Sequence, residues 1–217
     1  MAPGSRRESV RARMKSAAVR SSSSHSEDRR QALVAAAFRQ IAEHGFEGLR
    51  TRDVAAKAGV NIATLHYYFP TKETLIRGVV AHAMGRFRST LAPHGSAEDQ
   101  LANHLKAVRA LLRNEPELGA VMGELALRSA RDPSLARILR ESNEGWHRTL
   151  RGLLHRAARA GNLATGLDSD EAAALIVATL TSMVLPSLTS SRKDQAFREL
   201  GRWLNRMATP ARSRSSK

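Results

Sequence analysis

Apolar residues recur at helical spacing along almost the whole chain from residue 27 onward. In the segment RRQALVAAAFRQIAEHG, the apolar residues Val34, Ala37, Phe38 and Ile41 fall on one face of a helix. Gly45 follows as a natural C-terminal stop. No segment has a convincing strand pattern, and no internal repeat stands out. The pattern therefore predicts an all-α protein.

Capping residues, glycines and prolines divide the rest of the chain into helices. A hydroxyl or amide side chain is expected to cap each of the next three, and Gly59 and Pro70 separate them. The second helix is expected to start after its cap Thr51 and to run to Ala58. A short third helix, capped by Asn61, runs through Phe69, and a fourth one, capped by Thr71, runs to about Arg88. The later helices are expected from Ser96 to Arg113, from Pro116, from Asp132 to Ala160, from Asp168 to Leu185, and from Arg192 to Met207.

Composition and charge restrict the functions that are open to such a chain. The formal net charge is +15 and the sequence pI is about 11.4, which favours polyanionic partners such as nucleic acid or an anionic membrane. Cysteine is absent, so disulfides, thiolate metal sites and cysteine nucleophiles are excluded. A reducing compartment, the cytoplasm, is the expected location.

The ends of the chain differ in composition from its middle. Residues 1–27 hold eight serines and many arginines without apolar periodicity, and they are expected to form a disordered basic arm. This arm either is a solvated tail or reaches phosphates or a minor groove. Residues 209–217 are expected to be a disordered basic tail. Between them we expect two helical domains, over 28–75 and 76–208.

Membrane insertion and catalysis are both disfavoured. Residues 172–191 are uncharged and about as long as a bilayer core requires, but Pro186 and seven Ser or Thr residues favour a buried helix instead. No nucleophile elbow, phosphate-binding loop or H-E-x-x-H motif occurs. Glu144 and His147 have the spacing of a di-iron ligand pair, but the second pair that such sites need is missing. We therefore expect no enzyme, no cofactor and no metal site.

The strongest local signal lies in residues 51–75, TRDVAAKAGVNIATLHYYFPTKETL. Two short predicted helices meet at a glycine, and the second carries polar and aromatic residues, which is the pattern of a helix-turn-helix. Its second helix is of a size to enter a major groove. Small or apolar residues are expected where the two helices pack, namely Val54, Ala55, Ala58, Val60 and Leu65. The residues expected to face outward are Thr51, Arg52, Asn61, Thr64, His66 and Tyr67.

This region resembles the TetR family of bacterial transcriptional regulators. The resemblance covers about residues 31–77 and rests on HGFEGLRTRDVA followed by AAKAGVNIATLHYYFPTKETLI. It implies that rings of the aromatic cluster contact the DNA backbone or pack against neighbouring helices. The DNA-binding residues that it implies, position by position, are Thr51, Arg52, Asn61, Ile62, Ala63, Thr64, His66, Tyr67, Tyr68 and Lys72, with Leu65 and Phe69 in the core.

One position departs from the family pattern. His66 stands where the family usually has tyrosine, so the aromatic contact to DNA could have moved to Tyr67. His66 either donates to a phosphate or base, in which case binding would weaken as the pH rises through its pKa, or is a tolerated substitute.

The resemblance also implies a ligand cavity and a dimer interface in the C-terminal helices. The homodimer is expected to form through the last two helices, about residues 169–207. Residues that could line a pocket for an apolar ligand are Met122, Leu125, Trp146, Leu150 and Met183; the alternative for each is ordinary core. The expected function is a repressor that a small-molecule effector releases from a near-palindromic operator on double-stranded DNA. The alternative is a nucleoid-associated protein that compacts DNA with little regard to sequence.

Overall fold

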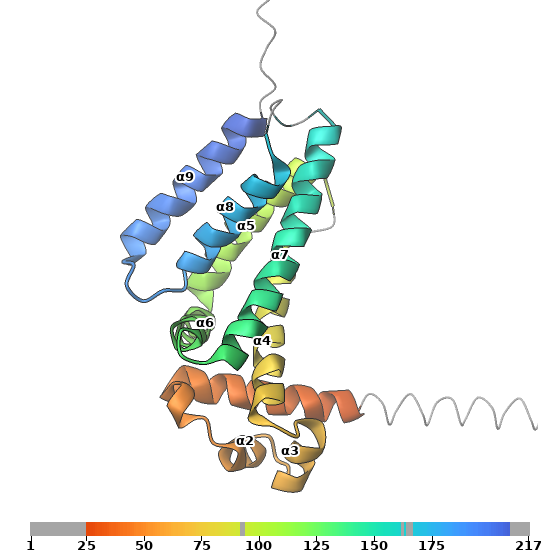
Figure 1. Cartoon of the computed structure of the whole chain (residues 1–217), viewed down its shortest axis with the longest axis vertical. Helices are drawn as coiled ribbons and strands as arrows, with labels where there is room; N and C mark the ends of the chain where they lie inside the picture. Colours follow the sequence, from red (N-terminus) through yellow and green to blue (C-terminus); the bar gives the residue numbers. More distant parts are fainter. Residues whose placement is uncertain (1–24, 92–93, 162, 164–166, 209–217) are drawn as a thin grey trace, which may run out of the picture.

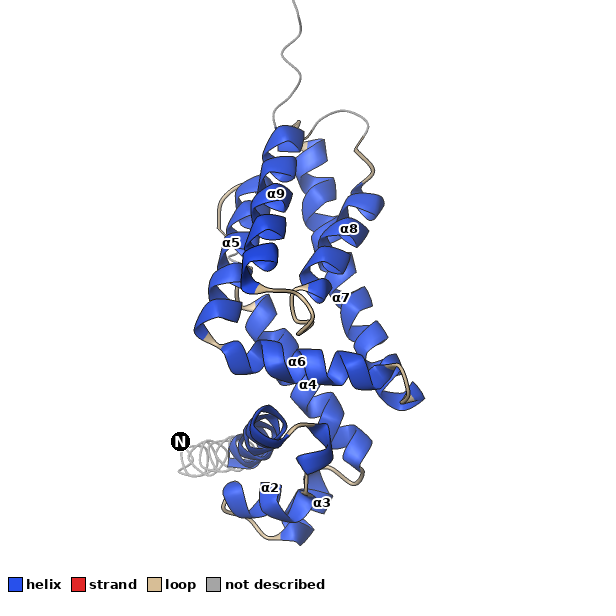
Figure 2. Cartoon of the chain, turned by 90° about the vertical axis from the view of Figure 1, so that its left-hand side faces the viewer, coloured by secondary structure: helices blue, strands red, loops and turns tan. Residues whose placement is uncertain are grey.

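The computed structural model describes residues 25–91, 94–161, 163 and 167–208. The predicted tail over 209–217 and residues 1–24 of the predicted arm lie outside this part. Residues 25–27, which were expected to belong to the arm, are helical instead. All regular secondary structure in the described part is helical, and no strand occurs there (Figure 2).

The N-terminal helices follow the predicted order. A first helix over residues 25–44 is followed by a 3-10 turn, η1 (Phe46–Gly48), and by α2 (Thr51–Lys57), α3 (Ile62–Tyr68) and α4 (Lys72–Arg88). The predicted caps of α3 and α4 are confirmed, because the Asn61 and Thr71 side chains accept from the backbone N–H of Thr64 and Thr74. The predicted Thr51 cap is wrong. Thr51 is the first helical residue of α2, and Arg50 precedes it without a side-chain cap.

Gly59 closes α2 in a way that depends on its lack of a side chain. Its φ is 69°, its N–H donates to Ala56 O, and the next N–H, of Val60, donates to Ala55 O. This pair of hydrogen bonds is a Schellman motif, which requires a left-handed residue at this position. The chain therefore turns sharply from α2 into the Asn61 cap of α3.

Five helices in the described part of the C-terminal half complete the fold. The helices are α5 (Ala97–Asn114), α6 (Pro116–Ser129), α7 (Pro133–Arg159), α8 (Ser169–Ser182) and α9 (Ser190–Ala208), with a connection of turns between the last two. The capping box of Ser96 with Asp99 is confirmed. The helix expected to reach Leu185 ends earlier, at Ser182, so the uncharged stretch 172–191 is not one continuous helix.

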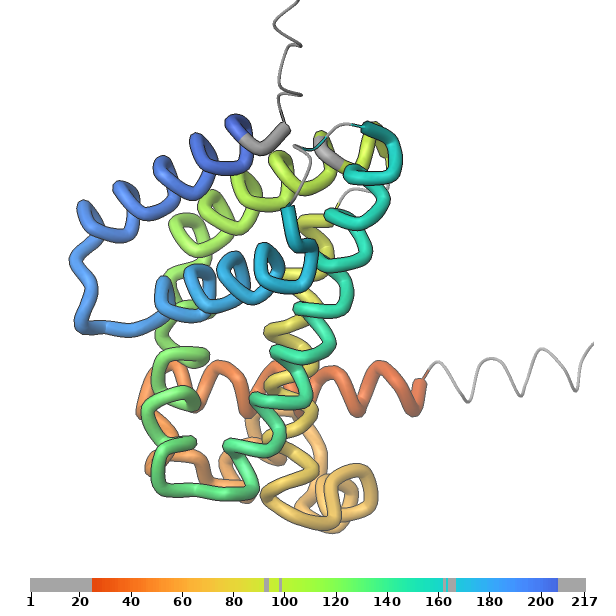
Figure 3. The backbone as a smooth tube through the Cα atoms, turned by 45° about the horizontal axis from the view of Figure 1, so that its top comes forward, coloured from red at the N-terminus to blue at the C-terminus, as the bar shows by residue number. Residues whose placement is uncertain are grey.

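The helices form two groups that share α4 (Figure 1). The first helix, α2 and α3 lie at one end of the molecule, and α5, α7, α8 and α9 form the bundle at the other end, with α6 between them. The tube view shows α4 passing from the first group toward the second (Figure 3). Helix α7 packs against α4, α5, α6 and α8. Helix α4 therefore belongs to both groups.

Buried apolar side chains pack the helices of each group against one another. The predicted apolar face of the first helix is confirmed, since Val34, Ala37, Phe38 and Ile41 are all buried. Gly78 on α4 lets the first helix approach closely, because a Cβ there would lie 2.9 Å from Val34 Cγ2. On α9, Phe197, Leu200 and Leu204 are buried, as their spacing predicted, while the Met207 side chain lies outside the described part.

Candidate nucleic-acid interface

Helix α3 divides its side chains between the core and one exposed face. Leu65 is 1% exposed and Phe69, which follows the helix, is 2% exposed, which confirms both as core. Tyr67 is 80% exposed and Ile62 is 37% exposed, although burial of such apolar surface is normally favourable. Ala63 and His66 are exposed as well. We call these four exposed residues, with Asn61 and Thr64, the α3 face.

The N-terminus of α3 is held by Asn61. Its Oδ1 accepts from Thr64 N at 2.8 Å and from Thr64 Oγ1 at 2.9 Å. This oxygen therefore caps the helix terminus, and the cap does not use the side-chain N–H groups of Asn61. Asn61 is thus a structural residue of the α3 face in addition to its predicted contact with DNA.

The aromatic cluster connects α3 to the start of the first helix. Tyr67 and Tyr68 meet edge to face with ring centroids 5.1 Å apart, and Tyr68 is half-buried. The Tyr68 hydroxyl donates to Ser26 Oγ at 3.2 Å, and the Arg30 guanidinium lies over the Phe69 ring. The described chain therefore begins beside α3. The sequence did not predict this contact, because Ser26 was assigned to the arm.

Cations near the α3 face differ in how far other groups neutralise them. Lys57 Nζ lies 2.7 Å from Glu43 Oε2, and Arg50 donates to Glu47 O. Arg52 and His66 are exposed, and neither side chain has a hydrogen bond or ion pair to another described residue. Thr51 is partly buried at the start of α2. The Arg52 guanidinium, next to Thr51 in the sequence, is therefore not neutralised by any described carboxylate.

Lys72 at the start of α4, a predicted DNA contact, also contacts an aromatic ring and lies near other charged side chains. Its Nζ lies 4.5 Å from the centroid of the Phe46 ring, and the Arg128 guanidinium lies at the same distance from that centroid. Burial lowers the pKa of Lys72, Arg50 lowers it further, and Asp132 raises it. Two cations, one from α4 and one from α6, thus share one aromatic ring in a cation–π arrangement.

Helix α6 makes further contacts with η1. The Glu124 carboxylate accepts from Phe46 N at 3.1 Å, and Arg128 forms an ion pair with Glu47. Glu124 and Arg128 both lie on α6, far from η1 in the sequence. No local pattern could connect them to a turn that lies 78 residues earlier in the chain.

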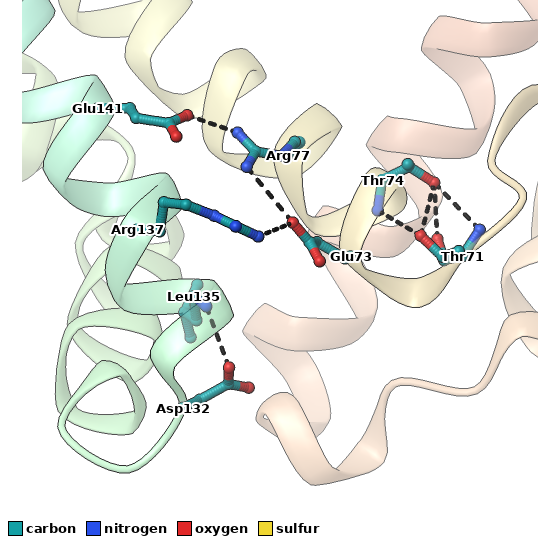
Figure 4. A network of polar contacts seen from close by, with 8 residues as sticks. All are labelled: Thr71, Glu73, Thr74, Arg77, Asp132, Leu135, Arg137 and Glu141. Atoms are coloured by element: carbon teal, nitrogen blue, oxygen red, sulfur yellow. Dashed lines mark hydrogen bonds and ion pairs between the residues drawn. The ribbon is translucent and has the colours of Figure 1, made fainter.

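Helix α7 holds the start of α4 through a second set of charges (Figure 4). Arg77 Nη1 lies 2.6 Å from Glu141 Oε2, and Arg137 Nη2 lies 2.8 Å from Glu73 Oε1. A hydrogen bond from Ser134 is the main reason that the pKa of Glu73 is lowered, and Arg137 adds to the effect. These side chains are substantially exposed, so solvent screens the attraction within each pair. Their role is to orient α4 relative to α7.

The five predicted pocket residues separate in the structure. Met122 and Trp146 line one cavity of about 210 Å³ between α4, α6, α7 and α8. Met183 lines another cavity of about 330 Å³, near α9. Leu125 and Leu150 are fully buried and line neither of these two cavities. Alternating burial along α6 and α7 does not distinguish a cavity wall from a filled core.

Within the described ranges, no three or more His, Asp or Glu side chains come together as metal ligands would. No helix in this part of the chain is both long enough and apolar enough to cross a membrane.

The helix-turn-helix geometry and the helical domain behind it define a class of DNA-binding transcriptional regulators. Residues 33–79 match the family model of bacterial regulatory proteins of the tetR family, and residues 91–201 match a tetracyclin repressor-like C-terminal domain. The chain belongs to the TetR family of transcriptional regulators.

Relatives and solved structures agree with this assignment. The fatty acid metabolism regulator protein of Bacillus subtilis (strain 168) is 26% identical over 165 residues, which cover 74% of this chain and 84% of the relative. A Rhodococcus protein described as a TetR-family regulator has a TM-score of 0.76 at 23% identity, over 84% of this chain and 100% of that one. The fatty acid degradation regulator FadR of Bacillus halodurans has a TM-score of 0.67 at 24% identity, over 82% of this chain and 94% of that one. The two structures are similar to this chain in fold.

Proposed function

We propose that the chain is a homodimeric repressor that binds a near-palindromic operator and leaves it when a small molecule enters the C-terminal domain. The observation that carries the proposal is the α3 face, where an exposed tyrosine and an exposed isoleucine stand beside polar side chains on a short helix anchored by Leu65 and Phe69. A rigid helix with an exposed mixed face suits the edges of base pairs in a major groove.

The proposed contact of each residue with DNA follows from its position. Asn61, Ile62, Ala63 and Thr64 at the start of α3 would meet base edges, and His66 and Tyr67 would meet bases or the backbone at its other end. The proposed phosphate contacts are Thr51, Arg52, Tyr68 and Lys72. The Tyr68 hydroxyl already contacts Ser26, so a phosphate would have to share it or replace Ser26. Because Ser26 lies beside α3, the basic residues that precede it in sequence would join the protein near the bound DNA.

The proposed dimer forms through α8 and α9. On α8, Ala174, Leu175 and Ala178 are exposed, and Leu175 keeps 49% of its surface accessible. Burial of such residues against their copies is favourable, and a two-fold interface pairs the same surface on both subunits. Two α3 helices related by this symmetry would require an operator with matching symmetry.

The proposed release uses α4 as the connection. Its first turn holds Lys72, and its second half supplies Met84 and Phe87 to the cavity of about 210 Å³. A ligand that prefers a different arrangement of these walls would shift the population away from the DNA-binding state. The names of two relatives refer to fatty acid metabolism and fatty acid degradation, so genes of fatty acid metabolism are the first candidates for regulated genes.

A second candidate is a protein that coats DNA without sequence preference, and the net charge of +15 is the observation that favours it. Such binding would depend steeply on salt and would be equal for most sequences. The specific regulator would instead retain a large preference for one site when the salt concentration rises.

The deciding experiment mixes the purified full chain with sheared genomic DNA at physiological salt and sequences the fragments that it retains. A short set of fragments that share one palindrome is the expected result. A titration of that palindrome and of a random duplex at two salt concentrations then measures the specificity ratio. Uniform retention without a common motif, together with equal affinities in the titration, would contradict the specific regulator and support the DNA-coating function.

A further inference from the structure

The cavity between α4, α6, α7 and α8 has two chemically different ends. Met84, Phe87, Met122 and Leu180 are apolar walls, and Trp146 closes the cavity on the side of α7. An engineered cavity of about 150 Å³ accepts benzene, so a volume of about 210 Å³ suits a small molecule of roughly ten heavy atoms. The inference below rests on the proposed role of this cavity as the effector site.

The Trp146 side turns an apolar surface toward the cavity because its polar group is used elsewhere. The indole Nε1–H of Trp146 donates to Nε2 of the fully buried His104 at 3.2 Å. The other ring nitrogen, His104 Nδ1, lies 2.6 Å from Thr90 Oγ1, which donates to Phe87 O. The indole N–H, both ring nitrogens of His104 and the Thr90 hydroxyl are therefore all hydrogen-bonded. At this end a ligand meets apolar surface that includes the indole and Phe87 rings, which stack on each other with centroids 5.5 Å apart.

The other end of the cavity carries hydrogen-bonding groups that are not used. Among the lining residues, all of which are in the described part, Arg140 is the one with a charge. Its guanidinium has no ion pair or hydrogen bond within that part, and the Asn143 and Thr181 side chains have no hydrogen bond there. Asn143 and Thr181 also line an open groove between α7 and α8, so this end faces the route to solvent.

The charge at this end is positive and uncompensated within the cavity. Glu144 lies one turn further along α7 and lines the groove, not the cavity. A cationic ligand would have to bring its charge beside Arg140. A carboxylate, in contrast, can accept two parallel N–H groups from a guanidinium.

We propose that the effector is a small amphipathic carboxylate. Its apolar body occupies the Trp146 end of the cavity, and its carboxylate is bound by Arg140 with a further hydrogen bond from Asn143. The length of the apolar body is set by the cavity, at roughly ten heavy atoms for the whole molecule.

The test compares three probes with the same alkyl chain, namely octanoate, 1-octanol and octylamine, on the full chain without DNA at neutral pH. The protein has two tryptophans, so a Trp203→Phe background leaves Trp146 as the single reporter of binding. We expect octanoate to change the Trp146 fluorescence and to bind about tenfold more tightly than octylamine, as a charge-assisted hydrogen bond requires. Arg140→Gln should remove about the same tenfold from octanoate and leave octanol unchanged.

Arg148→Gln is the matched control, since Arg148 is exposed on the same helix and lies outside the cavity lining. Equal binding of octylamine and octanoate, or equal losses for octanoate in the Arg140 and Arg148 variants, would overturn the proposal. Because fluorescence is read without DNA, its outcome is independent of operator binding. Charge-selective binding of octanoate that leaves a bound operator in place would keep the effector class and refute the release step.

Discussion

At the scale of single residues, cations near the proposed DNA contact differ in what surrounds them. Lys57 is paired with Glu43, and the Lys72 ammonium lies over the Phe46 ring. An aromatic ring holds a cation in position without neutralising its charge, whereas a carboxylate removes most of its field. Lys72 is therefore the better candidate for a phosphate contact.

We expect Lys72→Ala to weaken binding to the operator and to random DNA by the same factor and to flatten the salt dependence by about one unit of slope. Thr64→Ala should instead change the preferred base at defined positions, at about 1–3 kcal/mol for a good contact. Fluorescence anisotropy with operator variants at several salt concentrations measures both effects. Lys106→Ala, which removes one charge from α5, controls for net charge, and a changed base preference in Lys72→Ala would contradict its assignment.

Asn61 is a poor position for the same test. Its Oδ1 caps α3, so Asn61→Ala would lose the cap, at a cost of about 1 kcal/mol, together with any contact to a base. A change in DNA binding by this variant could not be attributed to recognition alone.

At the scale of elements, the buried His104 joins three helices. It lies on α5, receives a hydrogen bond from Trp146 on α7, and contacts Thr90, just beyond the end of α4. Because its Nε2 accepts from the indole, Nδ1 carries the proton of the neutral ring and donates to Thr90 Oγ1. Protonation of Nε2 would break the Trp146 hydrogen bond and place a charge in the core.

The folded protein should therefore resist protonation of His104. Burial lowers the pKa of His104 from 6.5 to about 4. His104 of the unfolded chain binds a proton near pH 6.5, and His104 of the folded chain binds one only near pH 4. The contribution of neutral His104 to the unfolding free energy is therefore complete above pH 6.5 and is lost as the pH falls toward 4. The expected loss is up to about 3 kcal/mol of unfolding free energy.

Urea unfolding of the wild type and of His104→Gln at a series of pH values measures this effect. The glutamine variant can retain one hydrogen bond but does not titrate, so its stability should fall less steeply between pH 6.5 and 4. Parallel curves for the two proteins would contradict the expected protonation of His104 on unfolding.

At the scale of the whole molecule, two sets of contacts connect the helix-turn-helix to the C-terminal bundle. Helix α6 holds η1 through Glu124 and Arg128, and α7 holds the start of α4 through Arg137 and Glu141. The same two helices line the cavity of about 210 Å³. A displacement of α6 or α7 by a ligand would therefore act on η1 and on the start of α4, between which α2 and α3 lie in the chain.

The assembly can be tested at the same scale. Leu175→Glu places a charge on the exposed apolar surface of α8 and should convert the proposed homodimer to monomers, with loss of tight binding to a palindromic operator. Leu127→Glu is the control, because Leu127 on α6 is 55% exposed and lies outside α8 and α9. Sedimentation velocity and operator titration give the two readouts. An unchanged dimer in Leu175→Glu would exclude α8 from the interface.

The sequence alone predicted the all-helical fold class and most helix boundaries. Both depend on interactions within a few residues, such as the cap of Asn61 on Thr64 and the apolar face of the first helix. Periodicity and caps are local, so they can be read without knowing the fold. Where a local signal was weak, as for the Thr51 cap and for the end of α8 at Ser182, the boundary was wrong.

The same locality explains the resemblance over residues 51–75, because a helix-turn-helix is built from neighbouring residues. Only the tertiary structure decided which apolar residues fill the core and which line a cavity. Trp146 lines the cavity and Leu150, one turn later on the same helix, does not. It also decided the pairing of Phe46 with Glu124 and of Glu73 with Arg137, which are 78 and 64 residues apart. Such contacts depend on how complete helices pack, and no local pattern records that packing.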